Sequence, residues 1–332
     1  HGQEDGGKLE HNGVTEEELK QLSDIEGYQQ WERIDRYFPE TGYVPDNEIK
    51  AGKPGFSPAK KIKPSESLKM YTVRKNGKDF LLRTDFSERY EEEATLAAFA
   101  HRVFEEGGAY VSSPLEVGAY FNDTMVYSIY NFFCGDNLAR RLPEFSTSHQ
   151  LSFGVEAGKL LKKLHSILPE EDDIPVHHED MFLILTKLEE KGINYEGFAE
   201  ANAFMKKYHA LPDNRPITAV HGSFSANSLF LDKDLNVGIL PLETAQWDDP
   251  VTDLISLSES YSLPFMKGVF KGLFEGQLPK DFFELLCFYR TYTALSDIDN
   301  AQSNEELDMA VLRAQKLSED YEKYQRVIPG WY

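Results

Sequence analysis

The chain contains few cysteines and no long apolar run. Cys134 and Cys287 are its two cysteines, far apart and without a cysteine or histidine at metal-ligand spacing nearby. This scarcity argues against a disulfide framework and against a zinc site. No apolar run reaches the roughly 18 residues that a membrane-spanning helix needs, and the first residues lack the basic and apolar regions of a signal peptide. We therefore expect a protein of the reducing cytoplasm.

Basic residues are scarce relative to acidic ones. Lysine and arginine number 35 against 56 aspartates and glutamates, and the formal net charge is −21. Such a chain repels phosphate backbones and anionic lipids, so we expect neither nucleic acid nor a membrane as partner. A cationic small molecule or an unidentified protein fits this charge better, although the charge equally fits an ordinary acidic soluble protein. The hydrophobic fraction of 41% predicts a folded globular chain.

The N-terminal part differs in composition from the rest. Residues 1–13 are rich in glycine and charge, which predicts a disordered tail. Thr15 and Glu18 have capping-box spacing and predict a helix start. Glycines and prolines recur over 40–57, the composition of a linker. We therefore predict a helical extension with its linker at 14–57.

The remaining sequence divides into a strand-rich part and a helix-rich part. Residues 58–131 show alternating apolar patterns, with the hairpin signal Asn76-Gly77 and a helix capped by Ser87. From residue 132 to the end, apolar residues recur mainly at helical spacing, interrupted by a strand-loop-strand pattern at 217–254. The predicted strands are 69–74, 79–83, 110–117 and 125–133, and the predicted helices are 87–105, 151–167, 182–191, 195–209 and several within 252–330.

The motifs at 217–254 resemble those of a known family. His221-Gly222-Ser223 is followed by Ser228 and then by Leu240-Pro241-Leu242. This frame is similar to the catalytic and metal-binding loops of the aminoglycoside phosphotransferase and choline kinase-like family, where His-Gly-Asp, Asn and Ile-Asp-Phe hold the matching places. The resemblance implies an α+β, two-lobed protein-kinase-like fold, with a small β-rich lobe at 58–131, a larger mainly helical lobe at 132–332 and the N-terminal helical segment as an addition.

The resemblance also implies roles for small-lobe residues. Arg83 would contact nucleotide phosphates, Glu93 would pair with Arg83, and backbone groups around Ile129 and Asn131 would meet a purine. A plain strand-end arginine and a solvated acidic helix face are the alternative interpretations. The loop at 63–67, in the phosphate-loop position, has no glycine and carries Glu66, which weakens the case for a bound nucleotide.

The residues that phosphoryl transfer needs are missing from the matched positions. The reaction needs a carboxylate to orient the incoming hydroxyl and hard oxygen ligands for Mg²⁺. Ser223, Ser228 and Pro241 stand at those places. A serine hydroxyl is too weak a base unaided, and proline offers no side-chain ligand. We therefore predict a pseudokinase that serves as a binding or regulatory module, with no intact catalytic residue, no metal site and no certain cofactor.

Other interpretations remain open at this stage. The first is an active phosphotransferase that uses ATP or GTP with Mg²⁺ on an aminoglycoside, amino alcohol or sugar, with Glu243 as the substitute acid. Asp232 and Asp234 fall in a predicted turn away from the cleft and are poorer substitutes. The second is a deliberate replacement of catalytic residues, and the third is a structural or partner-binding protein with a filled cleft.

Several polar residues match scaffold positions rather than reactive ones. His221, Asp249 and Asp253 match residues that hold the loops in the family by hydrogen bonds. We expect His165 to cap carbonyls or to pack at its helix end. Acidic residues are frequent over 297–308, which fits a polycationic ligand and equally fits a solvated surface.

Overall fold

The computed structural model describes residues 10–11, 67–75, 78–107, 113–120, 123–131, 135–169, 181–239 and 244–332. The predicted helical extension and linker at 14–57 lie outside these residues, as do Glu66, Pro241 and Glu243. Within residues 1–13, predicted as a disordered tail, the structure describes the strand β1 (Glu10–His11), which pairs with a neighbouring strand. Strand pairing uses backbone N–H and C=O groups, which polar residues carry as well as apolar ones.

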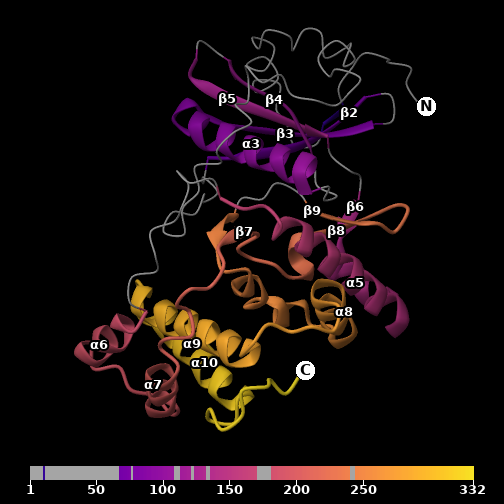
Figure 1. Cartoon of the computed structure of the whole chain (residues 1–332). Coiled ribbons are helices and arrows are strands. Elements are labelled where there is room, and N and C mark those ends of the chain that lie inside the picture. Colours follow the sequence, from indigo (N-terminus) through magenta and orange to yellow (C-terminus); the bar gives the residue numbers. More distant parts are fainter. Residues whose placement is uncertain are drawn as a thin grey trace.

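The small lobe is an antiparallel sheet with one long helix packed on it (Figure 1). Its other strands are β2 (Lys69–Lys75), β3 (Lys78–Phe86), β4 (Ser113–Tyr120) and β5 (Met125–Asn131), in the order β1-β2-β3-β5-β4. The helix α3 (Tyr90–Gly107) follows the 3₁₀ turn η2 (Ser87–Arg89). These elements match the sequence prediction to within a few residues. Ser87 is an exception, since it opens the 3₁₀ turn and does not cap α3.

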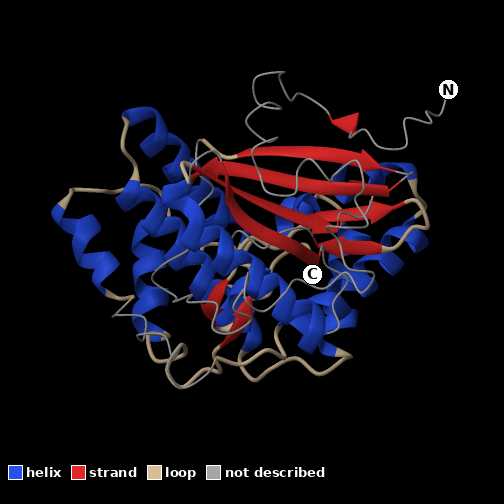
Figure 2. Cartoon of the chain, turned by 90° about the horizontal axis from the view of Figure 1, so that it is seen from above, coloured by secondary structure: helices blue, strands red, loops and turns tan. Residues whose placement is uncertain are grey.

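The large lobe is mainly helical, as predicted. In Figure 2 most of the helices lie beside the small-lobe sheet. Its α-helices are α4 (Leu138–Arg141), α5 (Thr147–Leu164), α6 (Leu183–Glu190), α7 (Phe198–Lys207), α8 (Leu263–Phe274), α9 (Phe282–Asn300) and α10 (Asn304–Asp320). Its strands are β6 (Gly135–Asn137), β7 (Thr218–Val220), β8 (Leu229–Asp232), β9 (Val237–Ile239) and β10 (Gln246–Asp248). The 3₁₀ turns are η3 (Leu142–Glu144), η5 (Ala226–Ser228), η6 (Pro250–Leu254) and η7 (Leu257–Ser260). No helix among the described residues is long and apolar enough to cross a membrane.

The two lobes share one hydrophobic core. Leu96, Phe99 and Val103 on α3 belong to the same buried cluster as the large-lobe helices. The Phe99 ring meets the fully buried Trp247 ring of β10 edge-on, with 6.0 Å between centroids. The Arg102 guanidinium lies 5.6 Å from the Trp247 ring centre and donates to the Leu168 carbonyl at 2.8 Å. The helix α3 is therefore fixed to the large lobe as well as to its own sheet.

Helices α5 and α8 touch through their backbones. Two glycines on each helix, four residues apart, face the other helix. A Cβ at Gly158 would lie 2.4 Å from the Val269 carbonyl oxygen, and one at Gly272 would lie 2.1 Å from the Val155 carbonyl oxygen. Gly154 and Gly268 make the matching close approaches. No larger side chain fits this interface without moving one of the helices.

The contact predicts that Gly158→Ala destabilises the protein. Alanine normally favours a helix over glycine by about 0.5–1 kcal/mol, but overpacking here is expected to cost about 1–3 kcal/mol. Urea unfolding measures the difference, and Gly330→Ala is the matched control, because a Cβ there meets nothing within 4 Å. An unfolding free energy that rises in Gly158→Ala would contradict the close packing.

Candidate functional site

The loop that carries the family motif connects β7 to η5 and is shaped by its backbone. Gly222 has φ +86°, and a Cβ there would lie 2.1 Å from the Thr244 carbonyl oxygen. The Thr244 hydroxyl donates to the His221 carbonyl at 2.6 Å. Glycine is therefore required at position 222, because both the backbone angle and the close approach exclude other residues.

A buried carboxylate holds this loop through hydrogen bonds to the loop backbone. Asp253 in η6 accepts the backbone N–H of His221 at 2.9 Å and that of Gly222 at 2.8 Å. Its Oδ2 also lies 2.8 Å from Nε2 of His165, at the end of α5. The Asp253 side chain is fully buried. Its scaffold role was expected from the sequence, whereas the hydrogen bond of His165 to Asp253 was not.

Burial and charge act in opposite directions on the groups of this cluster. Burial alone would raise the pKa of Asp253, but the hydrogen bond and electrostatic attraction of His165, with the Gly222 N–H, leave that pKa lowered. Burial lowers the pKa of His221, against the attraction of Asp253. The Ser223 N–H also donates to Nδ1 of His221 at 3.2 Å, and this bond requires an unprotonated Nδ1. His221 is thus held neutral as a structural side chain.

Ser223 is exposed, at the place where the family has its catalytic aspartate. Within the described residues, Ser223 contributes its backbone N–H to the bond with His221. A neutral hydroxyl at this point cannot accept a proton as a carboxylate does. The loop conformation is kept, but position 223 carries no side chain that can act as a general base.

Ser228 is used by the loop itself. Its hydroxyl donates to the Ser225 carbonyl at 2.8 Å and accepts the Ser225 N–H at 3.2 Å. The Ser225 hydroxyl in turn accepts the Asn227 N–H at 3.2 Å, so the two serines form a capping box around η5. A metal ion at this place would compete with two hydrogen bonds for a weak neutral ligand. Ser228 therefore does not fit the metal-binding role of the family residue that it replaces.

Arg83 and Glu93 form the ion pair that the sequence predicted. Nε of Arg83 lies 3.1 Å from Oε2 of Glu93, and a terminal nitrogen lies 2.9 Å from Oε1. The Ser128 hydroxyl donates to Oε2 of Glu93 at 2.9 Å. Both charged side chains are buried, so the pair and the hydroxyl together satisfy the charges inside the small lobe. Their role toward a nucleotide stays a prediction.

The predicted purine contacts fall at the end of β5. Ile129 is fully buried. Its strand lies between β3 and β4, and Ile129 pairs with a residue on each of these strands. Asn131 is exposed at the last position of the strand, next to residues 132–134, which lie outside the described chain. Asn131 also pairs with residues of β3 and β4, and both purine contacts stay predictions.

The other acids of the motif region serve the scaffold. Asp232 accepts the N–H groups of Asp234 and Asn236 at 2.9 and 2.8 Å and so closes the β8–β9 turn, as predicted. Asp249 takes two hydrogen bonds from Arg215, at 2.8 and 3.1 Å, and one from the Tyr289 hydroxyl at 2.7 Å. Within the described ranges, no three histidine, cysteine or acidic side chains are grouped to hold a metal ion.

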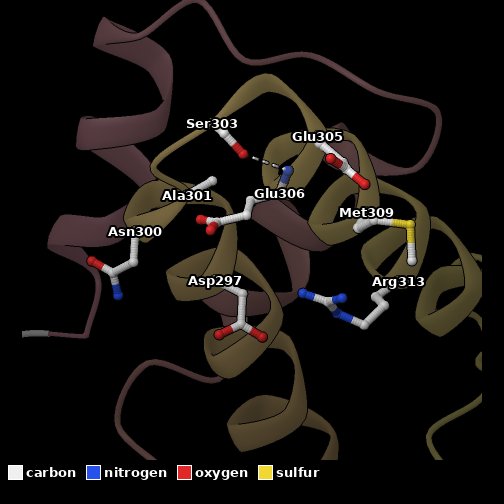
Figure 3. Close-up of a pocket in the computed structure, with 8 residues that line it drawn as sticks. All are labelled: Asp297, Asn300, Ala301, Ser303, Glu305, Glu306, Met309 and Arg313. Atoms are coloured by element: carbon white, nitrogen blue, oxygen red, sulfur yellow. Dashed lines mark hydrogen bonds between the residues drawn. The ribbon is translucent and has the colours of Figure 1, made fainter. Parts of the chain in front are cut away.

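The acidic region at 297–308 lines a pocket between α9 and α10 (Figure 3). Asp297, Glu305 and Glu306 line it together with Arg313, whose guanidinium group points toward the region between Asp297 and Glu306. One cation thus offsets part of the acidic charge. The Glu306 N–H donates to the Ser303 hydroxyl at 3.1 Å, so this acid belongs to a helix start.

Comparison with known proteins places these features in a family. The phosphotransferase enzyme family model matches residues 59–285, more than half of the chain, and the protein therefore belongs to that family. No curated protein shows significant similarity to the sequence.

Solved structures share the fold at low sequence identity. A thermostable mutant of an aminoglycoside phosphotransferase in the apo form is 11% identical, covers 78% of this chain and 93% of its own, and has a TM-score of 0.52. The wild-type aminoglycoside 2'-phosphotransferase-IIIa in its GDP complex is 12% identical, with coverages of 78% and 92% and a TM-score of 0.54. A choline/ethanolamine kinase family protein from Mesorhizobium loti is 16% identical, with coverages of 81% and 90% and a TM-score of 0.52. The protein thus has the kinase-like fold that the resemblance implied.

The buried ion pair predicts a large effect for Glu93→Gln. The change removes a charged partner from the buried Arg83 guanidinium, and breaking a buried ion pair is expected to cost about 3–5 kcal/mol of unfolding free energy. Glu196→Gln is the control, since Glu196 and Lys323 form an exposed pair expected to contribute less than about 1 kcal/mol. Urea unfolding measures both variants, and equal losses would contradict the account of the Arg83–Glu93 pair.

The lowered pKa of His221 predicts a loss of stability in mild acid. A group whose pKa is depressed by folding stabilises the native state fully above its unfolded pKa, about 6.5 for histidine, and that contribution is lost as the pH falls toward the folded pKa. We expect the unfolding free energy of the wild type to fall below about pH 6.5 more steeply than that of His221→Gln. Urea unfolding over a pH series measures this, and equal slopes would show that His221 is not held neutral.

Proposed function

We propose that this phosphotransferase-family protein is a pseudokinase, a catalytically impaired chain that works in the cytoplasm as a binding or regulatory module. The observation that carries the proposal is the state of the motif loop. Ser223 is an exposed neutral side chain at the place of the base, and the Ser228 hydroxyl is occupied by two hydrogen bonds to Ser225. Pro241, at the second metal-ligand position, has no side-chain donor atom.

Losses at three separate roles support the proposal more strongly than one loss would. A base, a metal ligand on the loop and a metal ligand after β9 act as a unit in phosphoryl transfer. Removing several members of such a unit leaves little for the remaining groups to do. The present residues do not fit Mg²⁺, so no catalytic step through the metal is derived for this chain. Its partner would be a protein or a cationic small molecule, in keeping with the net charge of −21.

Scaffold interactions explain why the fold persists without catalysis. The Asp253 cluster, the Arg83–Glu93 pair and the capping box at η5 are each satisfied by protein groups alone. A chain of this kind keeps its shape for binding after the reaction is lost.

The proposal predicts no phosphoryl transfer above the uncatalysed rate. The purified protein would be incubated with ATP or GTP, Mg²⁺ and representative aminoglycosides, amino alcohols and sugars, and the products followed by mass spectrometry. Phosphorylated product made by the wild type and lost in Glu243→Gln would overturn the proposal in favour of an active enzyme with a displaced acid. Asp234→Asn is the control for that variant, because Asp234 lies in the β8–β9 turn.

A further inference from the structure

A second pocket lies beside the motif loop, in a place that the proposed function does not explain. It has a volume of about 550 Å³, within the usual range for a ligand site. We call it the loop pocket. It is lined chiefly by polar residues from the end of β6, from α4, α5, η5 and η7, and from the segment that follows η7: Asn137, Arg140, Gln150, Asn227, Glu259 and Tyr261.

Hydrogen bonds fix the walls of the loop pocket to the motif loop. The Asn137 side-chain amide donates to the Asn227 carbonyl at 2.8 Å, and the Asn227 amide donates to the Glu259 carbonyl at 3.2 Å. Asn227 lies between Ser223 and Ser228 in the sequence. The Ser262 hydroxyl donates to Oε1 of Gln150 at 2.6 Å, and both residues line the pocket. The cavity is thus built before any ligand enters, and one wall belongs to the motif loop.

Two kinds of group in the loop pocket are available to a ligand: hydrogen-bond acceptors and an aromatic ring. Within the described chain, the Glu259 carboxylate and Oδ1 of Asn227 accept no hydrogen bond from another residue. Tyr261 is 87% exposed, with φ +53°, an unusual conformation for a bulky residue. Arg140 is the one cationic residue of the lining, and Asp136 pairs with it. The pocket therefore offers negative charge and a π face, with its own cation already paired.

We propose that the loop pocket binds an arginine side chain of a partner protein. A guanidinium group presents five N–H donors in a plane, which suits the Glu259 carboxylate and Oδ1 of Asn227 together. The face of Tyr261 attracts the same cation through its ring. The net charge of −21 favours approach of a basic partner. The inference rests on the proposed function, since it names the partner class of the binding module.

Exposed apolar side chains favour a protein over a free polyamine. Leu263 is 49% exposed, two residues after Tyr261 at the start of α8. An aromatic residue, an aliphatic residue and a charged pocket side by side are the composition of a protein-binding surface, where an anchor side chain enters a pocket and apolar contacts surround it.

An NMR titration of the full chain tests the proposal. The probe is a short glycine-serine peptide with one central arginine, compared with the same peptide carrying citrulline and with spermidine. Citrulline has nearly the shape of arginine without the charge. We expect saturable shifts of the Asn227 and Tyr261 amide signals with the arginine peptide and none with the citrulline peptide.

Matched variants locate the site. Glu259→Gln is expected to weaken binding by up to roughly fivefold, the loss of one solvent-accessible ion pair, while Glu305→Gln in the pocket between α9 and α10 leaves binding unchanged. Tyr261→Gly suits the left-handed backbone and should weaken binding roughly threefold without lowering the melting temperature.

Three results would overturn the proposal: equal binding of the citrulline peptide, binding of spermidine with no response to the arginine peptide, or no saturable shift at all. Equal binding of citrulline would indicate a site for neutral polar ligands, and spermidine alone would indicate a polyamine site. The phosphoryl-transfer assay on the same preparation is independent. Transfer activity would contradict the pseudokinase function and leave the arginine result standing.

Discussion

The buried carboxylate of Asp253 is the interaction on which the motif loop depends. A charge inside a protein is tolerated only when its surroundings pair with it, and Asp253 is paired with two backbone N–H groups and His165. The bonds to the loop come from its backbone, at His221 and Gly222. The backbone of the loop at His221 and Gly222 is therefore held without help from the side chain at position 223. This separation of shape from chemistry allows the family frame to persist without the reactive residues.

The contact between the lobes is likewise formed by side chains of the scaffold. In many two-lobed folds a bound ligand helps to join the lobes, but here α3 packs on Trp247 and enters the common core. The ion pair of Arg83 with Glu93 is completed by Ser128, a protein group. In the described structure, these protein contacts join α3 to the large lobe.

The sequence was informative where structure depends on near neighbours. Asn76-Gly77 marked the hairpin between β2 and β3, and the resemblance to the family implied Glu93 as the partner of Arg83. Contacts across long separations were not predictable, since His165 meets Asp253 from 88 positions away. The use of Ser228 in a capping box was missed, although the serine at position 225, three residues earlier, is a recognisable signal. The glycines of α5 and α8 were visible, but nothing in a single sequence shows which helices meet.

The central claim is that the loop has kept its structure and lost its metal site. Calorimetric titration of the wild type with ATP and GTP, in the presence and absence of Mg²⁺, tests this claim most directly. Ser228 and Pro241 offer no carboxylate or amide oxygen to the metal ion, so the account predicts that Mg²⁺ does not strengthen nucleotide binding. An affinity that rises about tenfold or more with Mg²⁺, a gain of about 1.4 kcal/mol, would contradict it.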